Sequence, residues 1–209
     1  DSTIVTTETL DEIAAGLGKK DEVAAITAAS MRGELDFTGS IDARVAMIAG
    51  LHRDVLHQTA RTTQLSPGAQ TLVKTMAHHG AKTVLVSGGF TFFTEPIASI
   101  CGFHAHHGNT LEWDGDQLTG KVLRPVLDKP AKATLLQQYC AELGIDPLHA
   151  ATIGDGANDR DMVTAAGLGV GYRPKPKLAA CTPHHIWHND LTALLFAQGF
   201  HHEEFIDVI

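Results

Sequence analysis

From about residue 66 to residue 209, short apolar runs closed by glycines alternate with helix-like segments, and this alternation constrains the fold most. The runs "KTVLVSGG", "HAATIG" and "GLGVGYR" are typical of strands, and helix-like segments follow the first two. This order predicts a doubly wound α/β fold with a mostly parallel sheet. We also expect a hairpin around Asp114-Gly115, a short strand in "HHIWH", and helices from about 91 to 101 and 132 to 143.

The chain before residue 66 has a different character. From Glu8 to about Thr63 it reads as consecutive helices, with stops near Gly16, Gly33 and Gly50 and no strand-like run. We therefore expect a helical cap over residues 7–65, inserted into a Rossmann-like α/β core formed by residues 1–6 and 66–209. A length of 209 residues with 44% hydrophobic content suits one domain with such an insertion.

The composition restricts the partners and the compartment. A formal net charge of −8 argues against nucleic acid or an anionic membrane as the main partner. No apolar run approaches the roughly 18 residues of a membrane span. The three cysteines are widely spaced without a CxxC pair, which predicts free thiols in a reducing compartment, the cytoplasm. We interpret the 13 histidines, many of them in adjacent pairs, mainly as exposed surface.

The loop "GDGAND" follows a predicted strand and holds Asp155 and Asp159. Ligands of doubly wound sheets collect at the carboxyl ends of strands. Two carboxylates at such a place suit a hard cation such as Mg²⁺, which prefers oxygen ligands. Taken alone, the two residues are better explained as caps of the following helix.

Two further segments could bind phosphate. In "VLVSGGF", Ser87 and Gly88 end a strand before a helix, where a hydroxyl and free N–H groups form an anion cradle. The alternative is a turn that needs glycine. In "DKPAKA", Lys132 lies near a helix start, where the helix dipole disfavours a cation unless an anion is close. The alternative is a solvated lysine, and Lys129 competes for the same role.

The four segments are more informative together than each is alone. Asp1 in "DST", the Ser-Gly cradle, a lysine and a second acidic loop all fall at predicted strand ends or helix starts. Carboxylates, a cation and fixed positive donors are what phosphoryl transfer requires. The set therefore predicts an enzyme that acts on phosphate esters.

The same segments resemble the motifs of the haloacid dehalogenase-type phosphatase superfamily, and within it those of the phosphoserine phosphatases. The matching stretches cover most of the chain and run in the family's order: "DSTIVTTETLDE", "MRGELDF", "SIDARV", "VSGGF", "DKPAKA", "GDGANDRDM" and the tail "DLTALLFAQGFHHEEFI". The resemblance implies Mg²⁺-dependent hydrolysis of L-phosphoserine to L-serine and phosphate, the last step of serine synthesis.

The resemblance also implies roles for individual residues. Asp1 would be the general acid and base, and its backbone carbonyl would reach Mg²⁺. Asp155 would be the side-chain metal ligand, supported by Asp159. The phosphoryl oxygens would be held by Ser87, Gly88, Lys132 and Asn158.

The cap would select the substrate. The resemblance implies that Arg44 grips the substrate carboxylate and that Glu8 accepts its ammonium group. Phe37 and Met31 would exclude water. Each has a plain alternative as a solvated arginine, a first-turn helix acid or cap core.

One part of the family pattern is not in this sequence. The family's nucleophile is an Asp two residues before the position of Asp1, at the end of a central strand. This sequence begins after both, so we expect it to be part of a longer chain whose upstream residues supply them. Regulatory domains upstream are also compatible with the resemblance.

Two other functions and one assembly stay open. The protein could transfer the phosphoryl group to an alcohol, or act on another small phosphomonoester. Alternatively, it could be an inactive module that senses phosphoserine or serine. A homodimer is compatible with the sequence.

Overall fold

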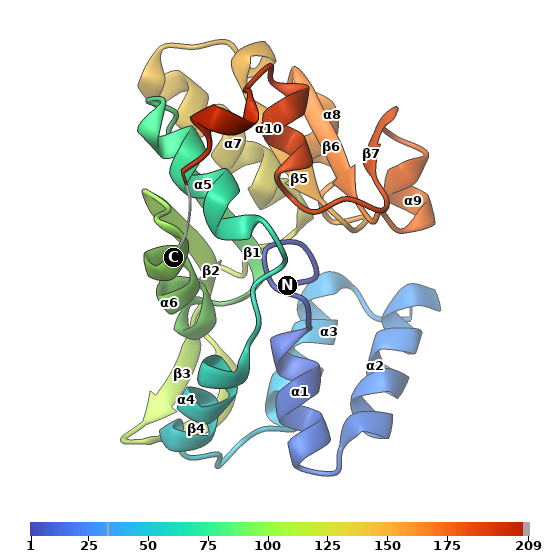
Figure 1. The fold of residues 1–209 in the computed structure, drawn as a ribbon. Helices are drawn as coiled ribbons and strands as arrows, with labels where there is room; N and C mark the ends of the chain where they lie inside the picture. The colour runs from blue at the N-terminus through green and yellow to red at the C-terminus, as the bar shows by residue number, and fades with distance from the viewer. Residues whose placement is uncertain (33, 207–209) are drawn as a thin grey trace.

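The structure is a computed structural model that describes residues 1–32 and 34–206, apart from the side chains at 27, 28 and 30–32. Figure 1 shows an upper part built of strands and helices and a lower part built of helices and a hairpin. The amino-terminal loop lies between the two parts. The elements that surround this loop position the candidate site.

Four helices follow the amino-terminal loop: α1 (Thr9–Gly16), α2 (Lys20–Arg32), α3 (Phe37–Ala46) and α4 (Arg53–Thr62). The Asp36 side chain begins α3 by accepting a hydrogen bond from the Gly39 N–H at 2.6 Å. Leu10, Ile13, Val45 and Leu56 are buried in one cluster, because apolar residues at helical spacing give each helix a core-facing side. The predicted run of helices is present.

The rest of the chain alternates strands and helices. Its first half has α5 (Ala69–His78), β1 (Val84–Phe90), α6 (Thr91–Cys101), β2 (Ala105–Asn109), β3 (Leu111–Asp114), β4 (Gln117–Val122) and α7 (Lys129–Leu143). Its second half has β5 (Ala151–Gly154), α8 (Arg160–Ala165), β6 (Leu168–Tyr172), α9 (Pro176–Ala179), β7 (His184–Ile186) and α10 (Ala193–Ala197). Single 3₁₀ turns occur at Pro147–His149 and His202–Glu204.

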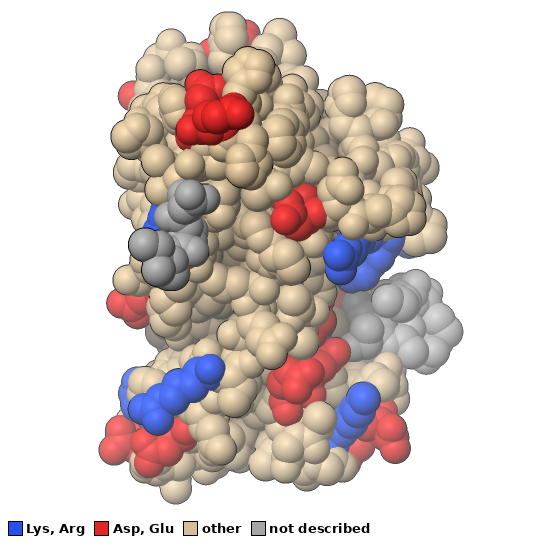
Figure 2. Space-filling view, viewed as in Figure 1, with Lys and Arg blue, Asp and Glu red and all other residues tan. Residues whose placement is uncertain are grey.

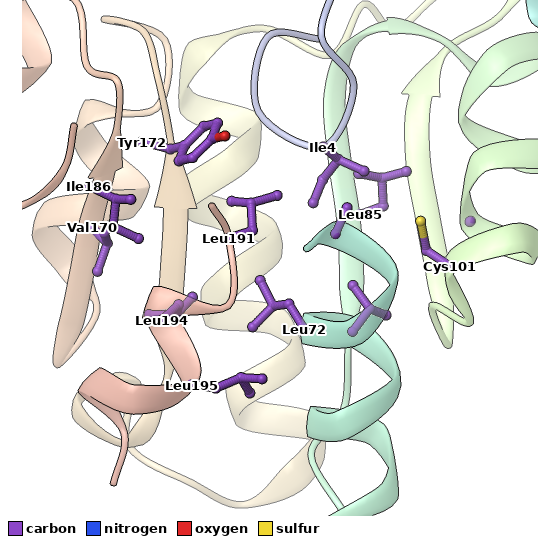
Figure 3. Packing of buried hydrophobic residues seen from close by; sticks show 13 residues of the cluster. Ile4, Leu72, Leu85, Cys101, Val170, Tyr172, Ile186, Leu191, Leu194 and Leu195 are labelled. Carbon is purple, nitrogen blue, oxygen red and sulfur yellow. The ribbon is translucent and has the colours of Figure 1, made fainter. Parts of the chain in front are cut away.

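The parallel strands form two separate sheets in the described residues. β1 pairs with β2, and β5, β6 and β7 pair in that order, all parallel. Side chains connect the two sheets, since Ile4, Leu85 and Tyr172 belong to one buried cluster (Figure 3). The further central strand that we expect upstream of Asp1 stays a prediction.

The hairpin β3–β4 packs on the helical part, although it follows the core strands in sequence. Its turn contains Gly115, as predicted, and the two strands are antiparallel. Gly50 N–H donates to the Leu118 carbonyl at 2.7 Å, and Leu118 N–H donates to the Leu51 carbonyl at 2.9 Å. Arg53 N–H donates to the Asp116 carbonyl at 2.8 Å. The division into a cap of residues 7–65 and a core of residues 1–6 and 66–209 stays a prediction.

One helix starts earlier than the sequence predicts. Helix α7 begins at Lys129, three residues before the predicted start, because Asp128 caps it and Pro130 suits its first turn.

The three cysteines are free thiols, and burial raises the pKa of Cys101 to about 11. No helix of the described residues is long and apolar enough to cross a membrane. On the face in Figure 2, acidic and basic side chains form small groups, and in the lower part of the view groups of opposite charge lie next to each other.

Candidate active site

The site is built from four loops that leave strands or begin helices. They are the amino-terminal loop, the turn from β1 into α6, the start of α7 and the loop from β5 into α8. Asp1, Thr9 and Ser87 line one small pocket among them. The structure therefore brings together the first acidic loop and the Ser-Gly cradle, as the sequence predicts.

The Asp1 carboxylate lies against the cradle. A Cβ placed on Gly89 would lie 2.9 Å from Oδ2 of Asp1 and 3.1 Å from Oγ of Ser87. A side chain at residue 89 would therefore displace one of these groups, so the close approach requires glycine. The Gly89 N–H donates to Ser87 Oγ at 2.9 Å, which leaves the hydroxyl hydrogen of Ser87 free to donate to a ligand.

Lys132, in the first turns of α7, forms a buried ion pair with Asp159 of the loop after β5. Its Nζ lies 2.5 Å from Oδ1 of Asp159, and the two side chains are 8% and 4% exposed. The other Asp159 oxygen accepts hydrogen bonds from the N–H groups of Asp155 and Gly156 at 3.1 and 3.0 Å. Asp159 therefore holds the loop and the lysine, and Lys132 is not the solvated lysine of the plain interpretation. Lys129 makes no described contact with this group.

Asp155 is buried and has two side-chain partners. Thr3 Oγ1 donates to Oδ1 of Asp155 at 3.1 Å, and Lys175 Nζ lies 3.0 Å from Oδ2. Lys175 also donates its backbone N–H to the Asp155 carbonyl at 2.8 Å. Burial opposes the charge of Lys175, but the hydrogen bond and the charge of Asp155 outweigh it and raise the Lys175 pKa.

The fit of these residues to Mg²⁺ can be tested on the contacts of Asp155. In the described residues, no group of three or more His, Cys, Asp and Glu side chains is arranged around one ion position. However, the Asp155 carboxylate already faces a cation, the Lys175 ammonium group, at 3.0 Å. Carboxylate and carbonyl oxygens are the donors that Mg²⁺ prefers, and it keeps waters at its other positions. The Asp155 carboxylate thus suits the ion, whereas Asp159 is engaged by Lys132. The Asp1 carbonyl accepts a hydrogen bond from the Thr3 N–H at 2.8 Å, and its role as a ligand stays a prediction.

The four residues that were predicted to select the substrate from the cap have different surroundings. Glu8 is exposed and accepts a hydrogen bond from Ser2 Oγ at 2.8 Å. A Cβ on Gly88 would lie 3.5 Å from the Phe37 ring, so Phe37 covers the cradle directly. Arg44 Nε donates to the Ser40 carbonyl at 3.3 Å. The Met31 backbone belongs to α2, but its side chain lies outside the described residues.

The charges of Arg44 and Glu8 both affect the pKa of Asp11. Burial and then the charge of Glu8 raise the Asp11 pKa, and the charge of Arg44 opposes this shift. Arg44 and Glu8 are thus both within electrostatic reach of Asp11, at the edge of the site. No described hydrogen bond points Arg44 at the cradle, so its role in substrate binding stays a prediction.

Asn158 belongs to the tight loop after β5. A Cβ on Gly156 would clash with Oδ1 of Asn158, and one on Gly154 would lie 2.5 Å from Cβ of Asp159. The glycines therefore let the loop fold back on its own polar side chains. This places Asn158 beside Asp155 and Asp159, where the sequence predicts it.

Three residues of the site were not predicted from the sequence. Lys175 follows the strand β6, so the rule that ligands collect at strand ends was a signal for it. Thr3 and Thr9 were visible only as hydroxyl residues near Asp1. Thr9 Oγ1 lies 3.5 Å from Oδ2 of Asp1, at the limit of a hydrogen bond.

Comparisons with known proteins show the family to which the chain belongs. A family model for haloacid dehalogenase-like hydrolases matches residues 1–164. The phosphoserine phosphatase of Streptomyces coelicolor is 44% identical over 176 residues, which are 84% of this chain and 43% of that protein. The phosphoserine phosphatase of a Polaromonas species is 43% identical over 184 residues, which are 85% of this chain and 78% of that protein.

A solved structure has the same fold. It is described as a phospho-aspartyl intermediate analogue of phosphoserine phosphatase, and it matches with a TM-score of 0.87 and 32% identity over 94% of both chains. The predicted α/β class is thereby confirmed. The chain spans 43% and 49% of the relatives from Streptomyces coelicolor and Mycobacterium tuberculosis, about half their length or less.

Proposed function

Because the chain belongs to the haloacid dehalogenase-like hydrolase family, we propose that its protein is a phosphoserine phosphatase, which hydrolyses L-phosphoserine to L-serine and phosphate. The observation that carries the proposal is the meeting of the Asp1 carboxylate and the Ser87 hydroxyl at Gly89. A proton-transferring carboxylate and a phosphate-binding hydroxyl within one small volume suit phosphoryl transfer. The names of the relatives support the choice of phosphoserine.

The cradle would hold the phosphoryl group through this chain's own donors. Ser87 lines the small pocket, and Lys132 supplies a buried positive charge. Fixed donors in a buried site stabilise the charge that develops on the phosphoryl oxygens. Asn158 would orient the phosphate and the attacking water from the loop after β5.

Asp1 would move the protons. The nucleophilic Asp expected two residues upstream attacks phosphorus, the P–O bond to serine breaks, and Asp1 protonates the leaving serine oxygen. In the second half, Asp1 takes a proton from water as the water attacks the aspartyl-phosphate. A carboxylate that acts first as an acid and then as a base needs to stay within hydrogen-bond reach of the reacting oxygen.

Mg²⁺ would supply charge neutralisation for the phosphoryl oxygens when it is bound. We propose that Asp155 and the Asp1 carbonyl hold it, with Asp159 as a support that keeps the loop folded. The Lys175 Nζ lies 3.0 Å from Oδ2 of Asp155, which supports the proposal that this carboxylate can bind a cation. We place the enzyme in the cytoplasm, in line with its free thiols.

The test of the activity is a malachite-green assay of free phosphate, made with the complete protein on L-phosphoserine. We expect phosphate release with Mg²⁺ and its loss with a chelator. Assaying a phosphorylated alcohol acceptor in parallel separates hydrolysis from phosphotransfer. No release of phosphate from phosphoserine with Mg²⁺ would refute the proposal.

The cap provides a test of substrate choice. Arg44→Ala should lower kcat/KM on phosphoserine by on the order of 10- to 100-fold, because a hydrogen-bonded charge is lost at the carboxylate. Activity on an aryl phosphate should change little, since that substrate has no such carboxylate. Arg61→Ala, at an exposed arginine of another cap helix, is the matched control. Equal losses on both substrates would remove Arg44 from this role.

A further inference from the structure

Asn109, the last residue of β2, is a buried polar residue that none of the roles above uses. It is 1% exposed and lies at an irregular point of the parallel pair β1–β2. The register runs from Val86 with His107 directly to Phe90 with Asn109. The cradle residues Ser87, Gly88 and Gly89 therefore leave the ladder, and their backbone groups need other partners.

One of these partners is the Asn109 side chain. Its Nδ2 donates to the Gly88 carbonyl at 2.8 Å. That carbonyl belongs to the same planar peptide unit as the Gly89 N–H, and the two groups point in opposite directions. Because Asn109 holds the carbonyl on one side, the Gly89 N–H is fixed on the other side, where it donates to Ser87 Oγ.

The neighbouring glycine makes this contact sterically feasible. A Cβ on Gly108 would lie 3.1 Å from the Thr91 nitrogen and 3.2 Å from the Gly89 carbonyl oxygen. Without a side chain, β2 lies close against the turn from β1 into α6. Asn109 is therefore held at a fixed distance from the cradle.

The other end of the same amide reaches the second phosphate-binding element. Asn109 Oδ1 accepts a hydrogen bond from the Leu127 N–H at 2.7 Å. The next residue, Asp128, caps α7 through a bond from the Ala131 N–H. The catalytic candidate Lys132 lies in the first turns of this helix.

We infer that Asn109 is a positioning residue that fixes the Ser87–Gly89 cradle and the start of the Lys132 helix relative to each other. The inference rests on the proposed phosphatase function and concerns its phosphate-binding half. Loss of the amide frees the Gly88–Gly89 peptide to rotate and releases Leu127. Both changes loosen the donors that meet the phosphoryl group, and neither lost hydrogen bond is made with a residue of the predicted cap.

The place of Asn109 behind the cradle predicts a pattern of effects that differs from that of a cap residue. A cap residue acts on one substrate, whereas a cradle residue acts on every phosphomonoester and on inorganic phosphate. Replacing Asn109 should therefore weaken phosphate binding equally for phosphoserine and for p-nitrophenyl phosphate. A purely structural residue lowers the melting temperature without this common shift.

The test uses Asn109→Leu and Asn109→Ala in the complete protein. Both remove the two hydrogen bonds but differ in the space they leave, so a shared effect reports the lost bonds rather than packing. The matched control is Thr182→Val: Thr182 is buried, donates to the Gly169 carbonyl at 2.6 Å and accepts from the His184 N–H, away from the cradle. The measurements are the melting temperature, the inhibition constant of inorganic phosphate, and kcat/KM on both substrates.

We expect the Asn109 variants to raise the inhibition constant of phosphate about 10-fold and to lower kcat/KM on both substrates by at least as much. Thr182→Val should leave these values within about twofold at a comparable loss of melting temperature. An inhibition constant that stays at the wild-type value in both Asn109 variants overturns the inference.

Failure of the proposed function gives a different result. A wild-type protein that hydrolyses p-nitrophenyl phosphate but not phosphoserine refutes the substrate and still tests Asn109 through the aryl ester. If neither ester is hydrolysed, the affinity for inorganic phosphate by titration calorimetry decides: weaker binding in the variants supports the role, and equal binding overturns it. A wild-type protein that binds no phosphate refutes both.

Discussion

At the scale of single residues, the contact of Asp1 with the Gly89 backbone decides what the site can do. Oδ2 of Asp1 and Oγ of Ser87 both approach the place where a side chain at residue 89 would be, at 2.9 and 3.1 Å. A phosphate oxygen held by Ser87 is therefore within reach of the carboxylate. Position and chemistry together support the proposal that Asp1 transfers protons and that Ser87 binds phosphate.

Asp1→Asn tests this assignment while keeping the size of the side chain. We expect kcat on phosphoserine to fall about 10²- to 10⁴-fold, because an amide cannot exchange the proton. Steady-state phosphate release measures the effect, and the melting temperature checks that the fold is kept. Turnover at the wild-type rate would take the proton-transfer role away from Asp1.

The ion pair of Lys132 and Asp159 leads to a prediction about stability. Lys132→Met leaves the Asp159 carboxylate buried with only backbone donors, so the free energy of unfolding should fall by about 3–5 kcal/mol. Denaturant unfolding measures the loss. The double variant Lys132→Met with Asp159→Asn should recover part of that stability but none of the phosphatase activity. Recovery of activity in the double variant would show that the lysine only neutralises Asp159.

The sequence predicted the residues that stand inside recognisable motifs, and missed those whose role depends on distant contacts. Predicted strand ends with glycines drew attention to Asp155 and Ser87, and a place near a predicted helix start drew attention to Lys132. Asn109 carries no local signal, because its importance depends on the irregular pairing of β1 with β2 and on a bond to Leu127. Lys175 was missed because the sequence alone does not show that β6 lies next to β5.

At the scale of elements, the hairpin β3–β4 is held tightly to the helical part. Gly120 has a φ of 82°, and a Cβ there would lie 2.7 Å from Cβ of Ala49. Gly115, in the turn of the same hairpin, also has a positive φ, of 58°, but a Cβ there would meet no atom within 4 Å. Comparing substitutions at the two glycines therefore separates the cost of backbone strain from the cost of overpacking.

Gly120→Ala should destabilise the protein by about 1–3 kcal/mol more than Gly115→Ala, because only the first adds overpacking to the shared strain. Chemical denaturation of both variants measures the difference. Equal losses would mean that the hairpin can move away from α3 at no cost. Catalytic constants per folded molecule should change for Gly120→Ala only if the hairpin influences the cap.

The order and type of the elements were largely predictable, and their packing was not. Helical spacing and capping residues gave the cap helices and α6, and Asp114-Gly115 gave the hairpin. The start of α7 was placed three residues late because Lys129 and Pro130 were interpreted as loop, whereas proline is well suited to a first helical turn. The attachment of the hairpin to the cap depends on contacts such as Gly50 with Leu118, which no local pattern reveals.

At the scale of the whole molecule, partly buried groups make the stability depend on pH. Burial, aided by the charge of neighbouring His106, lowers the His107 pKa, and His107 also bonds to the Tyr139 hydroxyl at 2.8 Å. Near pH 6 the unfolded chain then binds more protons at this histidine than the folded chain does. Stability therefore falls as the pH drops through the ordinary histidine value of about 6.5.

We expect the melting temperature of His107→Gln to fall less than that of the wild type between pH 7.5 and about pH 5.5. Thermal unfolding at several pH values measures both slopes. His149→Gln, at an exposed histidine, is the control and should keep the wild-type slope. Identical slopes for all three proteins would exclude His107 as a source of the pH dependence.

The attachment of the hairpin to the helices also has a mechanical consequence. The helical part joins the core through residues 6–8 and 63–66, and the hairpin joins it through residues 109–110 and 123–128, so four chain segments connect the two parts. Segment 123–128 runs directly into α7, the helix that carries Lys132. The attachment of the hairpin and the position of that lysine are therefore linked through one short stretch of backbone.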